Sequence, residues 1–286
     1  RRRDCGVVHN KEREMLNFND PLNPLNKDLR DAASTLTAGQ ARFMVDLYYQ
    51  WQEDRKSAHG QIRAASEEPE PHDVIMWLAE NTRKVEDNIK NALGIYANSQ
   101  TVGRWAQSIY GIGPVISAGL LAHIDITKAP TVGHIWSFAG QNPDQKWEKK
   151  TKRPFNAKLK VLVWKIGESF VKVSNNDNDV YGHVYKERKQ LEDERNEAGQ
   201  FSDQAERILT EKNIGKDTDA YKAYSQGKLP PAHIHARAKR YAAKLFLAHY
   251  HHVAYEVEYG TLPPKPYVID HLKHAHYIAP PNWPMD

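Results

Sequence analysis

The stretch that most constrains the fold is residues 100–126, QTVGRWAQSIYGIGPVISAGLLAHIDI. Two glycines, Gly111 and Gly113, stand within three positions and allow the chain to reverse where a side chain would clash. Pro114 suits the first turn of a helix, where no backbone N–H is needed. Apolar residues recur at helical spacing on both sides: Val102, Trp105, Ala106, Ile109, Ile116, Leu120, Leu121 and Ile124. The stretch therefore predicts a helix, a tight turn and a second helix.

Residues 109–124 resemble a helix-hairpin-helix motif, in which an apolar residue, Gly, an apolar residue and Gly precede a helix with Ala and paired Leu. The matching positions are Gly111, Ile112, Gly113, Ala118, Leu120 and Leu121. In such motifs free backbone N–H groups and the dipole of the second helix hold a DNA phosphate. The resemblance implies contacts from Gly111, Ile112, Gly113 and Val115 that read the DNA backbone and not its sequence. The alternative is an ordinary hairpin of two helices.

The composition sets limits on the class of protein. The chain has 286 residues, enough for one large or two ordinary domains, and its net charge of +4 is only mildly basic. Nucleic-acid binding must therefore come from local patches. Cys5 is the single cysteine, which excludes a disulfide framework and thiolate zinc sites and fits an intracellular protein. We expect no signal peptide, no membrane span and a cytoplasmic location.

Residues 1–99 predict a helical N-terminal region behind an irregular arm at 1–34, where Arg1, Arg2 and Arg3 are candidate phosphate contacts or a disordered tail. Helices are expected at 37–58, at 59–65 and from Asp73 to about residue 93. Thr37 with Gln40 forms a capping-box pattern. The apolar faces are expected to hold Phe43, Leu47, Tyr48 and Trp51 in the first helix, and Val74, Trp77, Leu78, Val85, Ile89 and Leu93 in the third. Arg55, Lys56 and Arg63 are expected on the outer side.

The densest basic run of the chain is 144–160, DQKWEKKTKRPFNAKLK, with only two acids, Asp144 and Glu148. Trp147 and Phe155 are interleaved with the cations, which suits a loop that follows phosphates beside the hairpin. A solvated loop is the alternative. The cations are Lys146, Lys149, Lys150, Lys152, Arg153, Lys158 and Lys160. The run separates a short helix at 134–143, ended by Gly140, from a strongly apolar core helix at 156–173.

The rest of the chain divides into a polar insertion, a long helix and a tail. The insertion at 175–229 predicts helices near 180–196, 202–212 and 218–226, with the acids at 192–194 on a solvated face. A long helix that starts at Pro230 and Pro231 and runs to Tyr259 carries apolar residues at near-heptad spacing, which pack within the protomer or against a second copy. These residues are Ile234, Ala238, Tyr241, Leu245, Ala248, His252 and Tyr255, with Arg237, Arg240 and Lys244 on a neighbouring stripe. Residues 261–286 hold six prolines and predict an extended strap.

Residues 104–173 resemble the C-terminal domain of the DEDD-class insertion-sequence transposases, which are guided by a bridge RNA. The family order is the hairpin GIGPVISAGLLAHI, the segment IWSFAGQNP, a basic link and the Asn-led helix NAKLKVL. A weaker likeness lies at 231–258. The resemblance implies a DNA-binding half from a phage or another mobile element. It does not extend to catalysis, because residues 1–99 lack the family's acid-bearing strands, and no serine follows Pro143 where the family has its nucleophile.

Other chemistry has weaker support in the sequence. Two histidine clusters, at 249–252 and 271–276, have spacings compatible with a metal, but no acid or cysteine is fixed beside them. We expect no cofactor, no metal and no catalytic residue. There is no P-loop, dinucleotide fingerprint or Ser-His-Asp context.

The sequence thus predicts a mostly α-helical chain with a helix-hairpin-helix core, flanking helical regions and an inserted polar helical arm. The boundaries are 1–99, 100–174, 175–229, 230–260 and 261–286. The first function hypothesis is a non-catalytic protein that binds double-stranded DNA, or structured RNA, and forms homo-oligomers. The second is an active recombinase or nuclease whose acidic metal site is supplied elsewhere. The third is an assembly protein that uses the hairpin and the long helix for packing.

Overall fold

The computed structural model describes residues 23–64, 73–145, 147–264 and 278–285. These residues form eleven α-helices and a short 3₁₀ helix, with no strand among them, so the mostly α-helical prediction is confirmed. The elements are α1 (Lys27–Ala33), α2 (Ala38–Ala64), α3 (Asp73–Asn98), α4 (Thr101–Ser108), α5 (Pro114–His123), η2 (Ile126–Lys128), α6 (Val132–Phe138), α7 (Ala157–Val173), α8 (Val180–Glu197), α9 (Ser202–Glu211), α10 (Asp219–Ser225) and α11 (Pro231–Tyr259). None of these helices is both long and apolar enough to cross a membrane.

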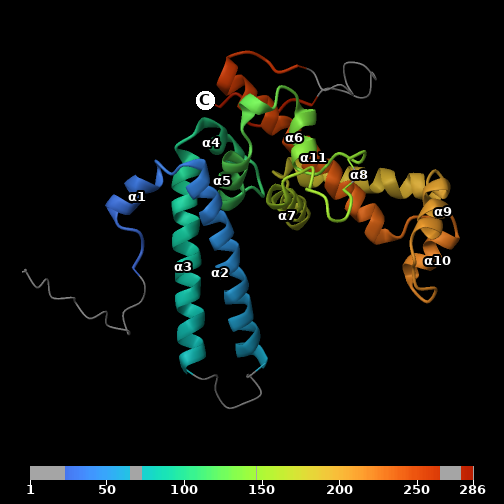
Figure 1. Ribbon diagram of the computed structural model, residues 1–286, viewed down its shortest axis with the longest axis horizontal. Coiled ribbons are helices and arrows are strands. Elements are labelled where there is room, and N and C mark those ends of the chain that lie inside the picture. Colours follow the sequence, from blue (N-terminus) through green and yellow to red (C-terminus); the bar gives the residue numbers. More distant parts are fainter. Residues whose placement is uncertain (1–22, 65–72, 146, 265–277, 286) are drawn as a thin grey trace, which may run out of the picture.

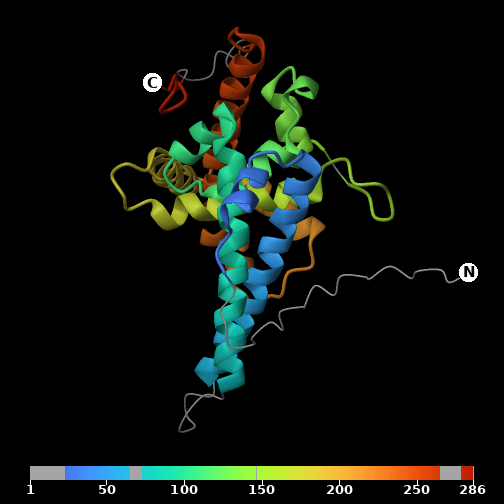
Figure 2. The ribbon, with the colours of Figure 1, turned by 90° about the vertical axis from the view of Figure 1, so that its left-hand side faces the viewer.

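The helices form a central group with two projections (Figure 1). Helices α2 and α3 lie side by side and extend away from the centre, while α8 and α11 run together toward α9 and α10. The view turned by 90° shows the same long α2–α3 pair below the centre (Figure 2). Helices α4 to α7 and the second half of α11 make up the centre.

Helix α5 joins the N-terminal helices to the centre, since it contacts α2, α3, α4 and α7. It can be covered on so many sides because Ser117, Ala118 and Gly119 are small and almost fully buried. The Ser117 hydroxyl donates to the Gly103 carbonyl at 3.0 Å, which fixes α5 on α4. A Cβ added at Gly119 would lie 2.8 Å from the Leu162 side chain of α7. The predicted helix–turn–helix is therefore present, and its second helix is closely packed against its neighbours.

The main core lies between α4, α7, α8 and α11. Trp105 is fully buried, stacks on Phe246 with ring centroids 5.9 Å apart, and donates its indole N–H to the Pro281 carbonyl at 2.9 Å. Phe170 stacks on Tyr181 at 4.8 Å in the same core. The C-terminal residues 278–285 thus pack onto the first helix of the hairpin, while residues 265–277 of the predicted strap lie outside the described residues.

The N-terminal helices differ from the prediction. Helix α2 is unbroken from Ala38 to Ala64, where two helices were expected, and the expected irregular arm contains α1. The capping box is confirmed, since the Thr37 N–H donates to Gln40 Oε1 at 2.9 Å and the Gln40 N–H donates to Thr37 Oγ1 at 3.3 Å. Arg1, Arg2 and Arg3 lie outside the described residues.

The prediction of the apolar faces of α2 and α3 is wrong in part. Phe43, Val74, Trp77 and Leu78 are exposed, because each helix of the pair covers only one stripe of the other. The buried positions include Ala41, Val45, Ala79, Thr82, Glu86, Ile89 and Leu93, several of them too small or too polar to mark a core in the sequence. Arg55 was expected on the outer side, but its guanidinium lies 2.5 Å from the Glu86 carboxylate of α3.

Two expectations for the second half of the chain are also corrected. The near-heptad stripe of α11 is fully buried only at Ile234 and Ala238, since Tyr241 is exposed and Leu245 is only half-buried. From residue 242 onward the buried face of α11 includes Ala242, Ala243, Phe246, Leu247, Tyr250 and Val253. Glu192, expected on a solvated face, is 1% exposed and its carboxylate lies 2.6 Å from the Arg237 guanidinium. Burial alone would raise the pKa of Glu192, but Arg237 and Arg188 hold it below its usual value.

We predict that Trp105→Ala lowers the free energy of unfolding by about 3–5 kcal/mol, because it leaves a large cavity and the Pro281 carbonyl without its donor. Trp77→Ala is the matched control, since Trp77 is 50% exposed and its loss should change stability by at most about 0.5 kcal/mol. Urea denaturation of both variants measures the difference. Equal effects would contradict this account of the core.

We also predict that acid weakens the fold through His249. Its Nε2 lies 2.9 Å from the Ile278 carbonyl and its Nδ1 lies 2.7 Å from the Tyr181 hydroxyl, an arrangement that suits the neutral ring. Burial lowers the pKa of His249 to about 4, whereas the unfolded chain takes the proton near about pH 6.5. The stabilisation is complete above about pH 6.5 and is lost as the pH falls toward about 4, with a decrease of about 2 kcal/mol by pH 5.

Urea titrations at neutral pH and near about pH 5 check this prediction, with His249→Gln as the variant that removes the titrating group. The variant should be less stable at neutral pH and should lose less stability on acidification. A wild-type stability that is equal at both pH values would contradict it.

Candidate nucleic-acid interface

The turn of the hairpin is held rigidly on α7. Gly111 has φ +88°, a left-handed conformation that favours glycine, and its carbonyl accepts a hydrogen bond from Ser169 Oγ at 2.5 Å. The Ile112 side chain is buried and its N–H donates to the Ile109 carbonyl at 3.0 Å. The Ile112 amide is therefore not available to a ligand, although the sequence assigned it to the phosphate site.

The start of α5 offers the donors that remain. Gly113 is the N-cap, and no side chain caps the helix. Within the described residues the N–H groups of Gly113, Val115 and Ile116 have no acceptor, while that of Ser117 donates to the Gly113 carbonyl. Gly113 is half-buried at the edge of a shallow depression lined by residues 107–113, and a Cβ added there would meet nothing within 4 Å. The Val115 side chain is buried, so this residue can contribute only its amide.

The basic run forms a loop from α6 to α7. Asn156 begins α7, since its side chain accepts from the Leu159 N–H at 3.0 Å, and its own N–H donates to the Phe138 carbonyl at 2.8 Å. Within the loop the Trp147 indole donates to the Thr151 carbonyl at 2.9 Å. The Arg153 guanidinium lies over the Trp147 ring at 5.1 Å. Lys149, Lys150, Lys152 and Arg153 are exposed, and Lys146 lies outside the described residues.

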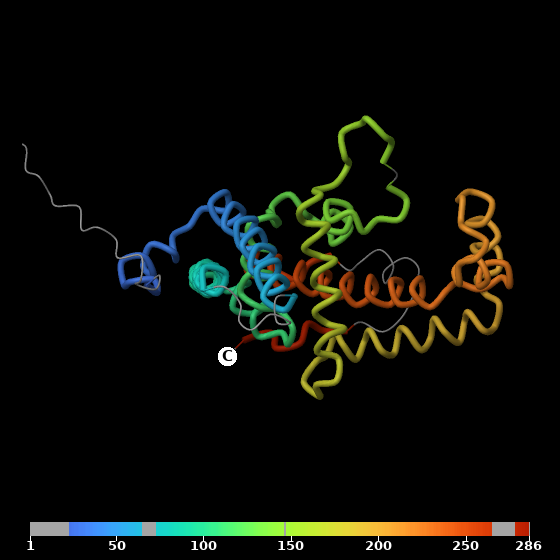
Figure 3. Tube along the Cα trace, turned by 90° about the horizontal axis from the view of Figure 1, so that it is seen from below, coloured from blue at the N-terminus to red at the C-terminus, as the bar shows by residue number. Residues whose placement is uncertain are grey.

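The structure does not bring the loop and the hairpin turn together. The loop enters α7 at its first residue, whereas the turn contacts Ser169 and Val173 near its last. Helix α7 has 17 residues, so its ends are about 25 Å apart. The tube view shows the loop at one end of α7 and the turn region at the other (Figure 3). The expectation of a loop beside the hairpin is therefore wrong.

Lys158 differs from the other described cations of the basic run in having an acidic partner. Its ammonium group forms an ion pair with the Asp46 carboxylate of α2. A phosphate would have to compete with this carboxylate, so Lys158 offers less positive charge to a ligand than its neighbours do.

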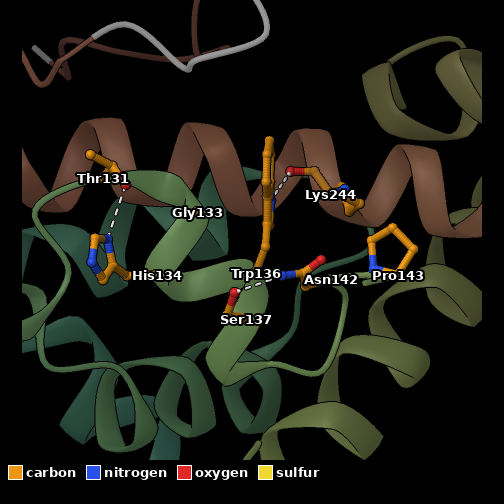
Figure 4. Close-up of a pocket in the computed structure, with 8 residues that line it drawn as sticks. All are labelled: Thr131, Gly133, His134, Trp136, Ser137, Asn142, Pro143 and Lys244. Atoms are coloured by element: carbon orange, nitrogen blue, oxygen red, sulfur yellow. Dashed lines mark hydrogen bonds between the residues drawn. The ribbon is translucent and has the colours of Figure 1, made fainter. Parts of the chain in front are cut away.

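Two pockets lie at the base of the loop. The first, drawn in Figure 4, is lined by Thr131, Gly133, His134, Trp136, Ser137, Asn142, Pro143 and Lys244. The Trp136 ring stands against α11, where its indole donates to the Lys244 carbonyl at 3.1 Å and the Lys244 ammonium group lies 4.3 Å from the ring. Partial burial lowers the pKa of Lys244.

The second pocket lies between α7 and α11 and has a volume of about 290 Å³. Its walls include Gln141 from the loop, Lys160 and Trp164 from α7, and Arg240 from α11. The sequence marked Arg240 and Lys244 only as a stripe, because nothing in it showed that α11 passes the base of the loop.

Seven cations gather at this end of α7, and together we call them the basic surface. They are Lys149, Lys150, Lys152, Arg153, Lys160, Arg240 and Lys244. Within the described residues none of the seven has a carboxylate within ion-pair distance, in contrast to Lys158 and Lys239. The surface therefore presents uncompensated positive charge although the chain as a whole is only mildly basic.

Catalytic and metal chemistry find little support in this region. In the first pocket Ser137 Oγ accepts from Asn142 Nδ2 at 3.3 Å, while His134 Nδ1 is bonded to Thr131 Oγ1 at 3.0 Å, so the serine and histidine are not paired (Figure 4). No group of three metal-ligating side chains occurs in the part of the chain that the structure describes. His249 and His251 are bonded to carbonyl groups, and the cluster His271, His274 and His276 lies outside that part.

Comparison of the chain with protein-family models, with curated proteins and with solved structures finds no match.

We predict that Gly113→Val keeps the fold and weakens binding of duplex DNA at least several-fold. Gly113 has φ −91° and open space at its Cβ, so the new side chain fits but stands where a phosphate would approach the amides. Gly111→Val is the contrasting variant, because φ +88° and Val173 at 3.1 Å from the added Cβ should destabilise the fold by about 1–3 kcal/mol. Thermal melts and anisotropy titrations separate the two effects. Unchanged affinity in folded Gly113→Val would remove the turn from the interface.

Proposed function

We propose that this protein binds the backbone of double-stranded DNA, without reading its sequence and without cutting it. The observation that carries the proposal is the basic surface, whose seven cations have no carboxylate partner among the described residues. Exposed cations of this kind bind phosphates and release the counterions condensed on a duplex. The amides of Gly113, Val115 and Ile116 supply a second contact point.

The two contact points suit an extended ligand with repeated charge. They are separated by about the length of α7, which exceeds the size of any single phosphate group. A duplex carries a phosphate charge for about every 1.7 Å of its axis. One duplex that passes both contact points can therefore place a phosphate at each of them. A small anion would engage only one of them.

A descent from the transposases of insertion sequences is part of this proposal. The order of hairpin, short helix with Ala-Gly, basic loop and Asn-capped helix supports it. The absence of a serine after Pro143 and of a Ser137–His134 pair supports a binding role over strand cleavage.

Self-association is the second candidate function. Val74, Met76, Trp77 and Leu78 are all exposed near the start of α3, on the projecting α2–α3 pair. Large apolar side chains that cluster in this way on a surface favour a protein contact. A homo-oligomer formed there would leave the basic surface free, so this role is compatible with DNA binding.

We predict that Lys149→Ala with Lys150→Ala weakens binding of a random duplex and lowers the slope of log affinity against log salt by about 2. Each lost phosphate contact removes about 0.9 of that slope. The matched control is Lys212→Ala with Lys216→Ala, which removes the same charge from exposed lysines of the α9–α10 region. Fluorescence anisotropy over a salt series measures both. Equal losses in the two double variants would mean that only net charge matters, and absence of binding at low salt would reject the proposal.

A further inference from the structure

The groove between α7 and α11 contains an exposed aromatic ring beside positive charge. Trp164 is 58% exposed and lines this groove. The Lys239 ammonium group lies 5.7 Å from its ring and is itself held by the Glu168 carboxylate of α7. The ion pair holds Lys239 beside the ring, and more than half of the Trp164 surface remains exposed.

Cations from both helices stand around this ring. Lys160 lies one helical turn before Trp164, with its ammonium group 4.3 Å from the Phe155 ring of the loop. Arg240 lines the groove from α11. The helices lie side by side at Gly167, where an added Cβ would lie 3.5 Å from Lys239, an ordinary van der Waals distance. The close crossing sets ring and cations within one groove of about 290 Å³.

This combination is the chemistry that binds an unpaired nucleotide. An exposed tryptophan gives a base a stacking surface, and neighbouring cations hold the phosphates on either side of it. The bases of an intact duplex are stacked on each other and cannot use such a ring. Gln141, where the basic loop begins, also lines the groove, so a strand that leaves a duplex on the loop reaches the groove directly.

We propose that the groove between α7 and α11 binds an unpaired segment of DNA, with one base stacked on Trp164 and its phosphates near Lys160 and Arg240. The inference rests on the proposed function, because the adjoining duplex is held by the basic loop. It adds a preference for junctions between paired and unpaired DNA.

Trp77 provides a matched comparison. It is 50% exposed, close to Trp164 in exposure, but lies on α3 in the projecting α2–α3 pair and has no cation over its ring among the described residues. Removal of Trp77 therefore controls for the loss of an exposed tryptophan as such.

The test compares three labelled probes by anisotropy: a blunt duplex, the same duplex with an oligothymidine tail, and the free oligothymidine strand. The wild type should bind the tailed duplex about tenfold more tightly than the blunt one. Trp164→Ala should abolish this gain and leave the affinity for the blunt duplex unchanged, Trp164→Phe should keep most of it, and Trp77→Ala should keep all of it. Tryptophan fluorescence of the wild type should fall on adding the free strand, and less so in Trp164→Ala.

The other possible outcomes each decide for or against binding of unpaired DNA in the groove. Equal affinity of the wild type for blunt and tailed duplexes, or an undiminished tail gain in Trp164→Ala, would overturn the inference and leave duplex binding in place. If Trp164→Ala does not fold, the Trp164→Phe variant and the quenching signal decide. Binding of the free strand alone, lost in Trp164→Ala, would support the groove while rejecting duplex binding as the function. A tail of RNA that is preferred to DNA would overturn the assignment to DNA.

Discussion

The structure depends on the burial of one short helix on almost every side. Helix α5 can contact α2, α3, α4 and α7 only because Ser117, Ala118 and Gly119 leave room for neighbouring backbones and side chains. Its Leu120 belongs to the main core, whereas Val115, Ala118 and Ala122 belong to the core shared with α2 and α3. The helix thus contributes to both hydrophobic clusters and helps to fix the projecting pair to the centre.

The same helix combines packing with the contact point that we propose for a phosphate. Packing uses the sides of α5, while the free amides lie at its first turn, where Gly113 leaves the backbone accessible. The turn is held from behind by Ser169 and Val173 of α7. The opposite end of α7 carries the basic loop, so one rigid helix sets the separation of the two contact points that we propose for DNA.

The sequence predicted the elements that depend on local signals and missed those that depend on partners. The glycine turn, the Thr37–Gln40 cap and the Asn-capped α7 follow from residues within one or two helical turns, and all three are present. The burial of Glu192 depends on Arg237, 45 positions away, and the role of Arg240 depends on where α11 crosses α7. Neither the burial of Glu192 nor the position of Arg240 can be recognised from neighbouring residues. The sequence therefore placed residues 192–194 on a solvated face. The distance between the hairpin turn and the basic loop likewise could not be predicted without the position of α7.

The contacts of Trp105 have a consequence for the order in which the protein is made. The core that α2, α3 and α5 share is complete once residue 122 has left the ribosome, since its members all precede that point. Trp105, by contrast, needs Phe246, Tyr250 and the Pro281 carbonyl, the last of them 176 positions later. During synthesis the Trp105 indole therefore stays exposed to solvent while more than half of the chain is still being translated. Nascent chains in this window expose an apolar surface of the kind that molecular chaperones recognise.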